Sequence, residues 1–396
     1  MVVSQDKPSL RILSICPQFR PIVGGYERAA ERLSAALASY GVSVVVIAER
    51  RDHTWPVREH VDGYEVRRLS CSYRRHRHVV SSLLSFAEFL LRHGRKFDVW
   101  HVHQYGFHAA LTVALGKVLH RPVVLKLPSS GAMGIEKAMG SAIAGRILRY
   151  VHQQVDACIV VSEQTREEAI HFGIEPEHIY RIPNGVDGGE FYPASPVERC
   201  TARRALGLHC ERLVLYVGRF SPEKNPVGLL EAWASINARV RDGALLALVG
   251  DGPDRARVQA KVQELNLAGS IHLAGQRSDV ATWYRAADVY VLPSLLEGLS
   301  NTMIEALASG LPVISTRVSG SATIAEPPLA GIVIDVGNTN DLAKALERLL
   351  VDKAKRSELG RNARLKFEKH FSLESISRTT VTLYKELLNL PIRETA

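Results

Sequence analysis

Several marks of well-defined protein classes are missing from this sequence. No apolar run approaches the roughly 18 residues that indicate a membrane span. The start, MVVSQDKPSLRILSIC, places an acidic residue and a proline before a short apolar run, unlike the basic start and apolar core of a signal peptide. We therefore expect a cytoplasmic protein that meets a membrane only as a peripheral protein at its inner face.

Cysteine is also scarce, and its spacing carries no pattern. The five cysteines include no CxxC pair and no metal-ligand spacing, so neither a disulfide framework nor a zinc site is predicted. A reducing compartment fits this usage. The first glycine pair also lacks the GxGxxG spacing of a dinucleotide site. These absences give no reason to expect a resident metal or organic cofactor.

Length and charge set broader limits. A chain of 396 residues exceeds the size at which one core usually keeps growing, so two domains are expected. The formal charge is +9, and basic residues crowd the segment 67–96. That segment can attract anionic lipid, a phosphorylated acceptor or nucleic acid, or it can be a plain solvated face. No nucleic-acid-binding module surrounds it, so no nucleic-acid partner is expected. Its cations are Arg67, Arg68, Arg74, Arg75, Arg77, Arg92, Arg95 and Lys96.

Short apolar runs alternate with helical periods along the chain. LRILSIC, residues 10–16, is suited to a buried strand, and the helix-like stretch YERAAERLSAALASYG separates it from VSVVVIAE. The alternation continues through FDVWHVH, RPVVLKL and ACIVVS, and restarts with LVLYVGR, ALLALVGDG, SIHLAG, DVYVLPS and PVIST. Strands that alternate with helices predict largely parallel sheets covered on both faces. Two doubly wound α/β domains in tandem are the simplest interpretation.

The alternation breaks at PNGVDGGEFYPASPVERC, residues 183–200. Its glycines, prolines and polar residues are typical of an interdomain linker. The pattern over Leu373–Leu388 predicts a final helix. The predicted division is a first domain at 1–187, a linker at 188–200, a second domain at 201–371 and a carboxyl-terminal helix at 372–396.

Parallel sheets bind ligands at the carboxyl ends of their strands, so residues just beyond predicted strands are site candidates. Gly24 and Gly25 precede the first helix, where bare backbone amides can approach a phosphate, although a plain loop glycine pair is the alternative. His101 and His103 share one face of FDVWHVH, where each can be a core residue, a metal ligand or a group at the site. A metal would need a third ligand, and no carboxylate cluster stands nearby.

The second half offers charged candidates. Arg219 and Lys224 follow LVLYV, where they can neutralise a diphosphate or serve as ordinary surface charges. Beyond DVYVLPS, the stretch EGLSNTMIEALASGLPVIST places Glu297 in a loop and Glu305 in a helix that Ser300 is suited to cap. Helix-start amides can hold phosphate, and carboxylates accept hydrogen bonds from hydroxyls. Phosphate with hydroxyls on both sides describes a nucleotide sugar.

A family resemblance rests on several of these stretches together. GGYE, HVHQYGF, VSEQTRE, PNGVD, VGRFSPEKN and VGDGPDR, followed by E-x7-E with ASGLPVIST, resemble the retaining glycosyltransferases of family 4. The resemblance implies the GT-B fold, two Rossmann-like domains facing each other across a cleft. It also implies a metal-independent hexosyltransferase, in which Arg, Lys and helix-start amides stabilise the departing nucleoside diphosphate.

The resemblance also implies a role for each candidate. Glu297 would hold hydroxyls of the donor sugar, and Glu305 would hold those of the ribose. Arg219 and Lys224 would bind the diphosphate, and His103 would contact the sugar near its reacting carbon. The catalytic residues predicted in this way are His103, Arg219, Lys224 and Glu297. The donor-binding residues are Gly24, Gly25, Gly218, Arg219, Lys224, Gly298, Leu299, Ser300 and Glu305.

Two segments depart from the family pattern. VSGSATIAE follows PVIST and has Ser319, Ala322 and Thr323 where relatives often have Gly, Pro and Glu. Pro128 stands where many relatives have a histidine, so residues 129–131 (Ser, Ser, Gly) would form an acceptor loop of a less common kind.

The sequence gives less information about which donor and acceptor are used than about the type of reaction. A UDP-hexose or UDP-N-acetylhexosamine is the favoured donor because the family uses UDP-sugars widely, and GDP-mannose stays open. The expected acceptor is a hydroxyl, on a lipid-linked or cell-envelope polysaccharide substrate near an anionic membrane surface. Two other classes stay open. One is a sugar-nucleotide epimerase of similar architecture, which needs no acceptor. The other is a non-catalytic basic protein that binds membranes.

Overall fold

The computed structural model describes residues 10–22, 24–128 and 143–391. Its contacts divide the chain into two compact units. Unit 1 contains the described residues up to Gly185 together with those from Leu373 onward, and unit 2 is Val186–Ser372. Among the described helices, none combines the length and apolarity that crossing a membrane requires.

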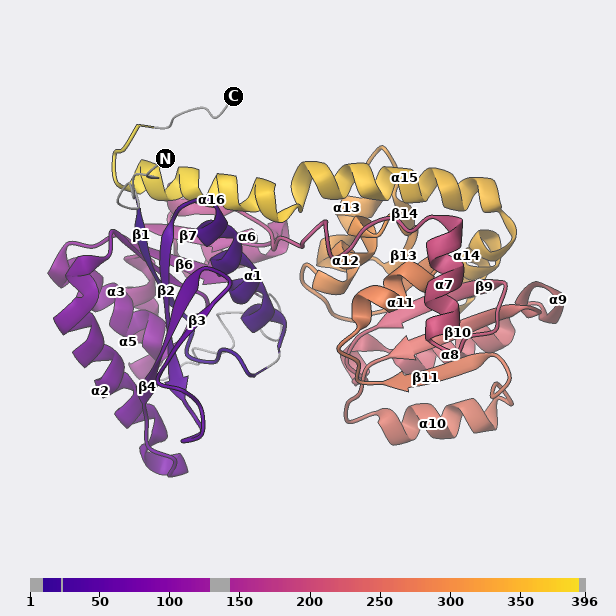
Figure 1. Ribbon diagram of the computed structural model, residues 1–396, viewed down its shortest axis with the longest axis horizontal. Helices are drawn as coiled ribbons and strands as arrows, with labels where there is room; N and C mark the ends of the chain where they lie inside the picture. Colours follow the sequence, from indigo (N-terminus) through magenta and orange to yellow (C-terminus); the bar gives the residue numbers. More distant parts are fainter. Residues whose placement is uncertain (1–9, 23, 129–142, 392–396) are drawn as a thin grey trace, which may run out of the picture. The chain divides into compact units, whose positions relative to one another are not determined.

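Unit 1 is built on an eight-stranded sheet in the order β3-β4-β2-β1-β5-β6-β7-β8 (Figure 1). Its strands are β1 (Arg11–Ile15), β2 (Ser43–Arg50), β3 (Arg58–Val61), β4 (Tyr64–Ser70), β5 (Val99–Val102), β6 (Val123–Leu127), β7 (Ala157–Val160) and β8 (Ile179–Arg181). All neighbours are parallel except β3 and β4. The strand order reverses at β1, which lies between β2 and β5.

Helices cover both faces of this sheet. They are α1 (Gly25–Ser39), α2 (Arg75–His93), α3 (Phe107–Leu119), α5 (Ile143–Gln153), α6 (Glu163–Phe172) and α16 (Leu373–Leu387), with one-turn 3₁₀ helices η1 (Gly94–Lys96) and η3 (Pro176–His178). On one face, Phe86 of α2, Val113 of α3 and Phe172 of α6 share a core. On the other face, Leu33 of α1 and Leu383 of α16 belong to a second core. The end of the chain therefore helps to build unit 1.

Unit 2 is built on a fully parallel six-stranded sheet in the order β11-β10-β9-β12-β13-β14. Its strands are β9 (Arg212–Val217), β10 (Ala244–Val249), β11 (Ile271–Gly275), β12 (Val289–Leu292), β13 (Val313–Thr316) and β14 (Gly331–Ile334). The order reverses at β9, which lies between β10 and β12. A parallel sheet of this kind forms its ligand crevice beside such a reversal.

The helices of unit 2 again lie on both faces of the sheet (Figure 1). They are α7 (Pro196–Ala205), α8 (Pro226–Ser235), α9 (Ala238–Arg241), α10 (Arg255–Glu264), α11 (Val280–Ala286), α12 (Asn301–Ala308), α13 (Ala322–Ala325), α14 (Thr339–Val351) and α15 (Lys353–His370), with η4 (Pro222–Lys224) and η5 (Ser319–Ser321). Trp233 of α8, Val258 of α10 and Leu346 of α14 pack into one core. Helix α12 packs on α15, and α7 packs on α11.

The predicted fold class, two doubly wound and largely parallel α/β domains, is confirmed. Sequence patterning missed β3 and β4, because β3 has no buried residue and β4 carries charged residues among its apolar ones. It also missed the start of α7. That helix begins at Pro196, inside the segment 188–200, where Ser195 and Glu198 form a capping box.

Candidate functional site

The charged candidates of unit 2 lie beside the reversal of its strand order. Gly218 and Arg219 follow β9, and Glu297 lies in the loop that follows β12. Because β9 and β12 are neighbouring parallel strands, their carboxyl ends meet at the same edge of the sheet. The topology therefore gathers residues that are far apart in sequence.

The loop after β9 is held by backbone contacts. The Tyr216 hydroxyl donates to the Arg219 carbonyl at 3.0 Å, and the Gly218 amide donates to the Val249 carbonyl at 3.0 Å. Arg219 itself is exposed. Asn225 has a φ of 52° and caps α8, since its Oδ1 accepts from the Gly228 amide at 3.2 Å. These contacts fix both ends of the segment that presents Arg219 and Lys224.

Gly250 supports this loop from the next strand, and the sequence prediction did not include it. Its φ is +147°, and a Cβ added there would lie 1.9 Å from the Gly218 carbonyl oxygen. Only glycine combines that backbone with that close approach. The signal that could have found it is the VGDG stretch directly after β10, whose glycines follow a buried strand.

Lys224 and Glu297 form an ion pair, although they come from different loops. Their side chains are 23% and 13% exposed, so the pair is partly shielded from water. Ser294 Oγ also donates to Glu297 Oε2, at 3.5 Å. The Leu295 amide donates to the Glu223 carbonyl at 2.8 Å and ties the two loops together. The structure therefore brings Lys224 and Glu297, which were predicted separately, into direct contact.

Helix α12 begins after Ser300, as predicted, but the expected side-chain cap is wrong. Ser300 makes no capping hydrogen bond to the helix amides, and its Oγ lies 2.9 Å from Thr302 Oγ1 instead. Thr302 Oγ1 also accepts from the Tyr290 hydroxyl at 2.7 Å, and the Thr302 carbonyl accepts from the Tyr284 hydroxyl at 2.9 Å. This network, which sequence reasoning missed, anchors the first turn to the sheet.

The other predicted donor-binding residues surround that turn. Gly298 and Leu299 lie in the loop directly before Ser300, and Leu299 is buried. Glu305 lies within α12 and is only 4% exposed. A buried carboxylate requires polar partners, so this position is unlike an ordinary surface glutamate.

The candidates of unit 1 lie at the corresponding reversal of its own sheet. His103 directly follows β5, and its amide donates to the Ile15 carbonyl at the end of β1, at 3.1 Å. Gly24 and Gly25 stand at the start of α1, which follows β1. Both sheets therefore bring their candidates to the place where α/β sheets bind ligands.

His103 belongs to a buried polar chain. A hydrogen bond of 2.9 Å joins its Nε2 to Ser14 Oγ. Its ring stacks on His101 at a centroid distance of 4.2 Å, and His101 Nδ1 lies 2.6 Å from the Tyr384 hydroxyl of α16. Burial, assisted by the charge of Lys126, lowers the pKa of His103 to about 3. His103 is therefore neutral at physiological pH, and its ring orientation is fixed by its neighbours.

The glycine pair at the start of α1 has an acidic neighbour. A Cβ added at Gly24 would lie 2.2 Å from Glu27 Oε2. The Glu27 side chain is buried, its Oε2 accepts no hydrogen bond from the described residues, and burial raises its pKa. A carboxylate already lies beside the helix start to which the sequence assigned phosphate.

The basic segment 67–96 is less uniform than its sequence indicated. Arg67 forms an ion pair with Glu65, and the buried Arg68 forms one with Glu59, so both are held on β4. Arg67 and the buried Arg68 are therefore less available to an anionic partner than the sequence alone indicated. The cations that remain on the surface belong to α2, its flanking residue Arg74 and η1.

Two predictions, the acceptor loop and metal independence, stay untested. The proposed acceptor loop at residues 129–131 lies outside the described residues. Over the described ranges, no three His, Cys, Asp or Glu side chains gather closely enough to hold a metal ion. Metal independence stays a prediction.

Comparison with known proteins gives consistent results. Residues 200–366 match the family model "Glycosyl transferases group 1", and residues 23–188 match "Glycosyltransferase Family 4". A D-inositol 3-phosphate glycosyltransferase of Corynebacterium kroppenstedtii is 28% identical over 305 residues, 74% of this chain and 63% of that protein. The chain thus spans less than two thirds of that relative.

Two further similarities cover more of the compared proteins. The UDP-Gal:alpha-D-GlcNAc-diphosphoundecaprenol alpha-1,3-galactosyltransferase of Escherichia coli is 28% identical over 304 residues, 74% of this chain and 76% of that protein. The crystal structure of Anabaena Alr3699/HepE in complex with UDP and glucose matches with a TM-score of 0.77 and 17% identity, over 94% of this chain and 99% of that one. The fold is therefore GT-B, and the chain belongs to glycosyltransferase family 4.

Proposed function

We propose that this protein transfers a sugar from a nucleotide-sugar donor to a hydroxyl acceptor, with retention of the anomeric configuration. The observation that carries the proposal is the cluster beside β9 and β12, where cations, carboxylates and a helix start occur together. Lys224 and Arg219 suit a diphosphate, whereas Glu297 and Glu305 suit hydroxyls. Family membership supports this assignment.

The reaction requires that the negative charge on the departing nucleoside diphosphate be stabilised. The bond from the anomeric carbon to the diphosphate breaks, and a bond to the acceptor oxygen forms on the same face of the sugar. The departing phosphate oxygen takes the acceptor proton. Arg219, Lys224 and the α12 start would stabilise the charge that develops on the diphosphate. The Lys224–Glu297 pair would open or be shared when the donor binds, which leaves Glu297 for the sugar hydroxyls.

For unit 1 we propose contacts with the sugar and the acceptor. A neutral His103 can donate or accept one hydrogen bond without adding charge near the reacting carbon. We favour a UDP-hexose or UDP-N-acetylhexosamine, since the Anabaena protein was crystallised with UDP and glucose and the Escherichia coli relative is named for UDP-Gal. That relative's name also includes a diphosphoundecaprenol acceptor, which supports a role in envelope glycan or glycolipid synthesis.

The first test is calorimetric titration with UDP, GDP and ADP and their common sugar conjugates, with and without EDTA. We expect one nucleotide to bind, with an affinity that EDTA does not change. Lys224→Ala should weaken that binding, whereas Arg257→Ala, an exposed cation on α10, should not. Absence of binding by every nucleotide would overturn the donor site. Interconversion of the bound sugar without any acceptor would instead identify an epimerase.

We also propose that α2 contacts an anionic membrane surface. Val80, Leu84 and Leu91 are 61%, 67% and 55% exposed, and their spacing places them along one side of the helix. The exposed Arg77 and Arg92 lie on the same helix. Apolar residues flanked by cations are typical of helices that lie in the interface of an anionic bilayer.

Vesicle sedimentation tests this proposal. The protein should bind vesicles that contain phosphatidylglycerol and should be released by salt, because charge supplies part of the attraction. Leu84→Gln/Leu91→Gln should reduce binding several-fold. Val197→Gln/Val351→Gln, which alters two comparably exposed residues of unit 2, should have no effect. Equal loss in both variants, or no binding at low salt, would exclude α2 as the contact.

A further inference from the structure

A large basic cavity opens at the other edge of the unit 2 sheet. Its volume is about 1090 Å³, which is the size of a small-molecule site. Arg212 begins β9, Asp288 directly precedes β12 and Pro312 directly precedes β13, so the cavity lies at the amino ends of these strands. The candidate donor residues follow the carboxyl ends of β9 and β12. The two places therefore lie at opposite edges of one sheet.

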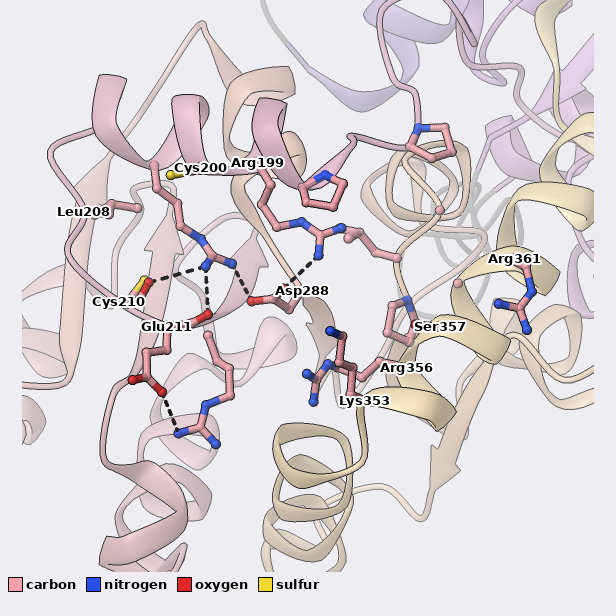
Figure 2. Close-up of a pocket in the computed structure, with 18 of the residues that line it drawn as sticks. Arg199, Cys200, Leu208, Cys210, Glu211, Asp288, Lys353, Arg356, Ser357 and Arg361 are labelled. Carbon is pink, nitrogen blue, oxygen red and sulfur yellow. Dashed lines mark hydrogen bonds and ion pairs between the residues drawn. The ribbon is translucent and has the colours of Figure 1, made fainter.

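Helices α7 and α15 form the walls of this cavity, and Figure 2 shows side chains from both of them around Asp288. Eight lysine and arginine side chains line the cavity, against the carboxylates Asp288 and Glu211. No phenylalanine, tyrosine or tryptophan is among the described residues that line it. The cavity therefore concentrates positive charge without offering a surface on which a base could stack.

Part of this charge has a structural role. Asp288 Oδ1 accepts from Arg199 at 2.9 Å, and Asp288 Oδ2 accepts from Arg203 at 2.5 Å (Figure 2). Asp288 Oδ2 also accepts from the Leu213 amide at 2.8 Å. This arrangement ties α7 to the sheet. It uses Asp288, one of the two carboxylates that line the cavity, for Arg199 and Arg203.

Three further arginines donate to backbone carbonyls, which bind a guanidinium without neutralising it, and one of them, Arg364, also forms an ion pair with Glu368 at 2.7 Å. Arg356 donates to the Leu350 carbonyl at 2.9 Å, and Arg364 donates to the Ala308 carbonyl at 2.7 Å. Arg212 donates to the Asp242 carbonyl, and its contact with Glu211 is long, at 3.9 Å. Burial lowers the pKa of Arg356, and the charges of Arg212 and Arg199 lower it further against the opposing effect of Asp288. Arg356 and Arg212 are therefore held chiefly by carbonyls, whereas Glu368 neutralises Arg364.

The remaining three cations are available to a ligand. Arg204 on α7 and Lys353 and Arg361 on α15 are exposed. Among the described residues, none forms an ion pair or a hydrogen bond with the charged groups of these three. In addition, the Nε atoms of Arg199 and Arg212 are buried and have no hydrogen-bond partner in the described part of the chain. Buried donors of this kind are normally satisfied.

We propose that this cavity binds a small molecule that carries two or more phosphate groups, at a site separate from the donor site. Arginine forks match phosphate oxygens, and several cations spread over two helices match more than one phosphate. The concave shape favours a compact ligand over a nucleic-acid strand, which would need an extended basic track with stacking aromatics.

The test is calorimetric titration of inorganic tripolyphosphate at low salt. The parent protein for every comparison is Arg219→Ala/Lys224→Ala, which lacks the cations proposed for the donor diphosphate, so the contribution of the donor site is reduced. We expect saturable binding in this parent. Inorganic monophosphate should bind at least about tenfold more weakly, because it can engage fewer cations at once.

A matched pair of variants locates the site. Arg204→Glu/Lys353→Glu reverses one cation on each wall and should weaken tripolyphosphate binding about tenfold or more. The control Arg257→Glu/Arg348→Glu makes the same change of charge, also with one residue near a helix start and one in a last turn, outside the cavity. It should change the affinity less than twofold.

Three results would overturn the proposal: no saturable binding in the parent, equal weakening in both variants, or equal affinity for monophosphate and tripolyphosphate. Thermal melting of each variant excludes loss of folding as the cause. Failure of this test leaves the nucleotide titrations unaffected, and failure of those titrations leaves this test unaffected, because the two sites use different residues.

Discussion

The two sheets place their candidate residues at the same topological position but surround them differently. Beside β9 and β12 in unit 2, Lys224 and Glu297 form an ion pair with side chains 23% and 13% exposed. Beside β1 and β5 in unit 1, His103 is 4% exposed and hydrogen-bonded to Ser14. In both units the reversal of strand order determines where the candidate residues lie. Burial and neighbouring charges determine the charge state and the partners of those residues.

This difference suggests a division of labour. A partly exposed cluster of cations beside a helix start is suited to charge that develops on a diphosphate. A buried neutral imidazole is suited to an uncharged hydroxyl. A second difference is the Glu27 carboxyl group, which is buried beside Gly24 at the start of α1, where burial raises its pKa.

The largest predicted effect comes from breaking the support of the unit 2 loop. Gly250→Ala would force a Cβ against the Gly218 carbonyl and strain a backbone at φ +147°. We expect a loss of about 3 kcal/mol in unfolding free energy, measured by urea denaturation. Gly269→Ala is the control, since a Cβ added there meets nothing within 4 Å. Equal stability of the two variants would show that the loop shifts at little cost.

The second prediction separates chemistry from binding. Glu297→Gln removes the charge that pairs with Lys224 and that we assign to the donor sugar during bond breaking. Turnover should fall about 100-fold, while the affinity for free nucleotide should change less than threefold. Steady-state kinetics and calorimetry measure the two quantities. Glu231→Gln, at an exposed position on α8, should change neither. Equal losses of turnover and affinity would argue against a role in the transition state.

The sequence predicted this region well where its signals are local. Ser300 before an apolar helix and Glu305 within it are neighbours in the chain, and α12 begins where predicted. The Lys224–Glu297 pair could not be predicted, because 73 positions separate the partners and only the order of the strands brings them together. The same holds for Gly250 and Gly218, whose contact depends on the pairing of β9 with β10.

Unit 1 was harder to predict for a related reason. The environment of His103 depends on Tyr384, whose hydroxyl meets His101 across 283 positions. A period of two in FDVWHVH shows that both histidines share a face, but it cannot show that α16 covers that face. Burial, and with it the lowered pKa, is a tertiary property. The candidate residue could be named from sequence, whereas its charge state could not.

The third prediction uses that pKa to sharpen the comparison. The folded pKa of His103 is about 3 and the unfolded value is about 6.5, so the unfolded chain binds more protons at acid pH. Stability is complete above about pH 6.5 and is lost as the pH falls toward the folded pKa. Between pH 6.5 and 5, His103 should contribute a loss of about 1.6 kcal/mol in unfolding free energy.

Urea denaturation at both pH values measures this loss. In His103→Gln it should be smaller by about that amount, because the titrating group is gone. His53→Asn, which alters a histidine whose side chain is 84% exposed, should leave the wild-type pH dependence in place. An unchanged pH dependence in His103→Gln would mean that His103 is not buried as a neutral ring.

The smallest predicted effect tests whether Glu305 and Glu297 have different roles in binding and turnover. Glu305 is buried in α12, and we assign it to the ribose, which is held alike before and during bond breaking. Uniform binding of this kind lowers KM without raising kcat. Glu305→Gln should therefore weaken nucleotide affinity about tenfold and leave turnover at saturating donor within about threefold. Because the site is buried, thermal melting must first show that the variant folds. Loss of turnover with intact affinity would show instead that Glu305 acts during bond breaking, the role that we assign to Glu297. The two carboxylates of unit 2 would then not differ in the way that we propose.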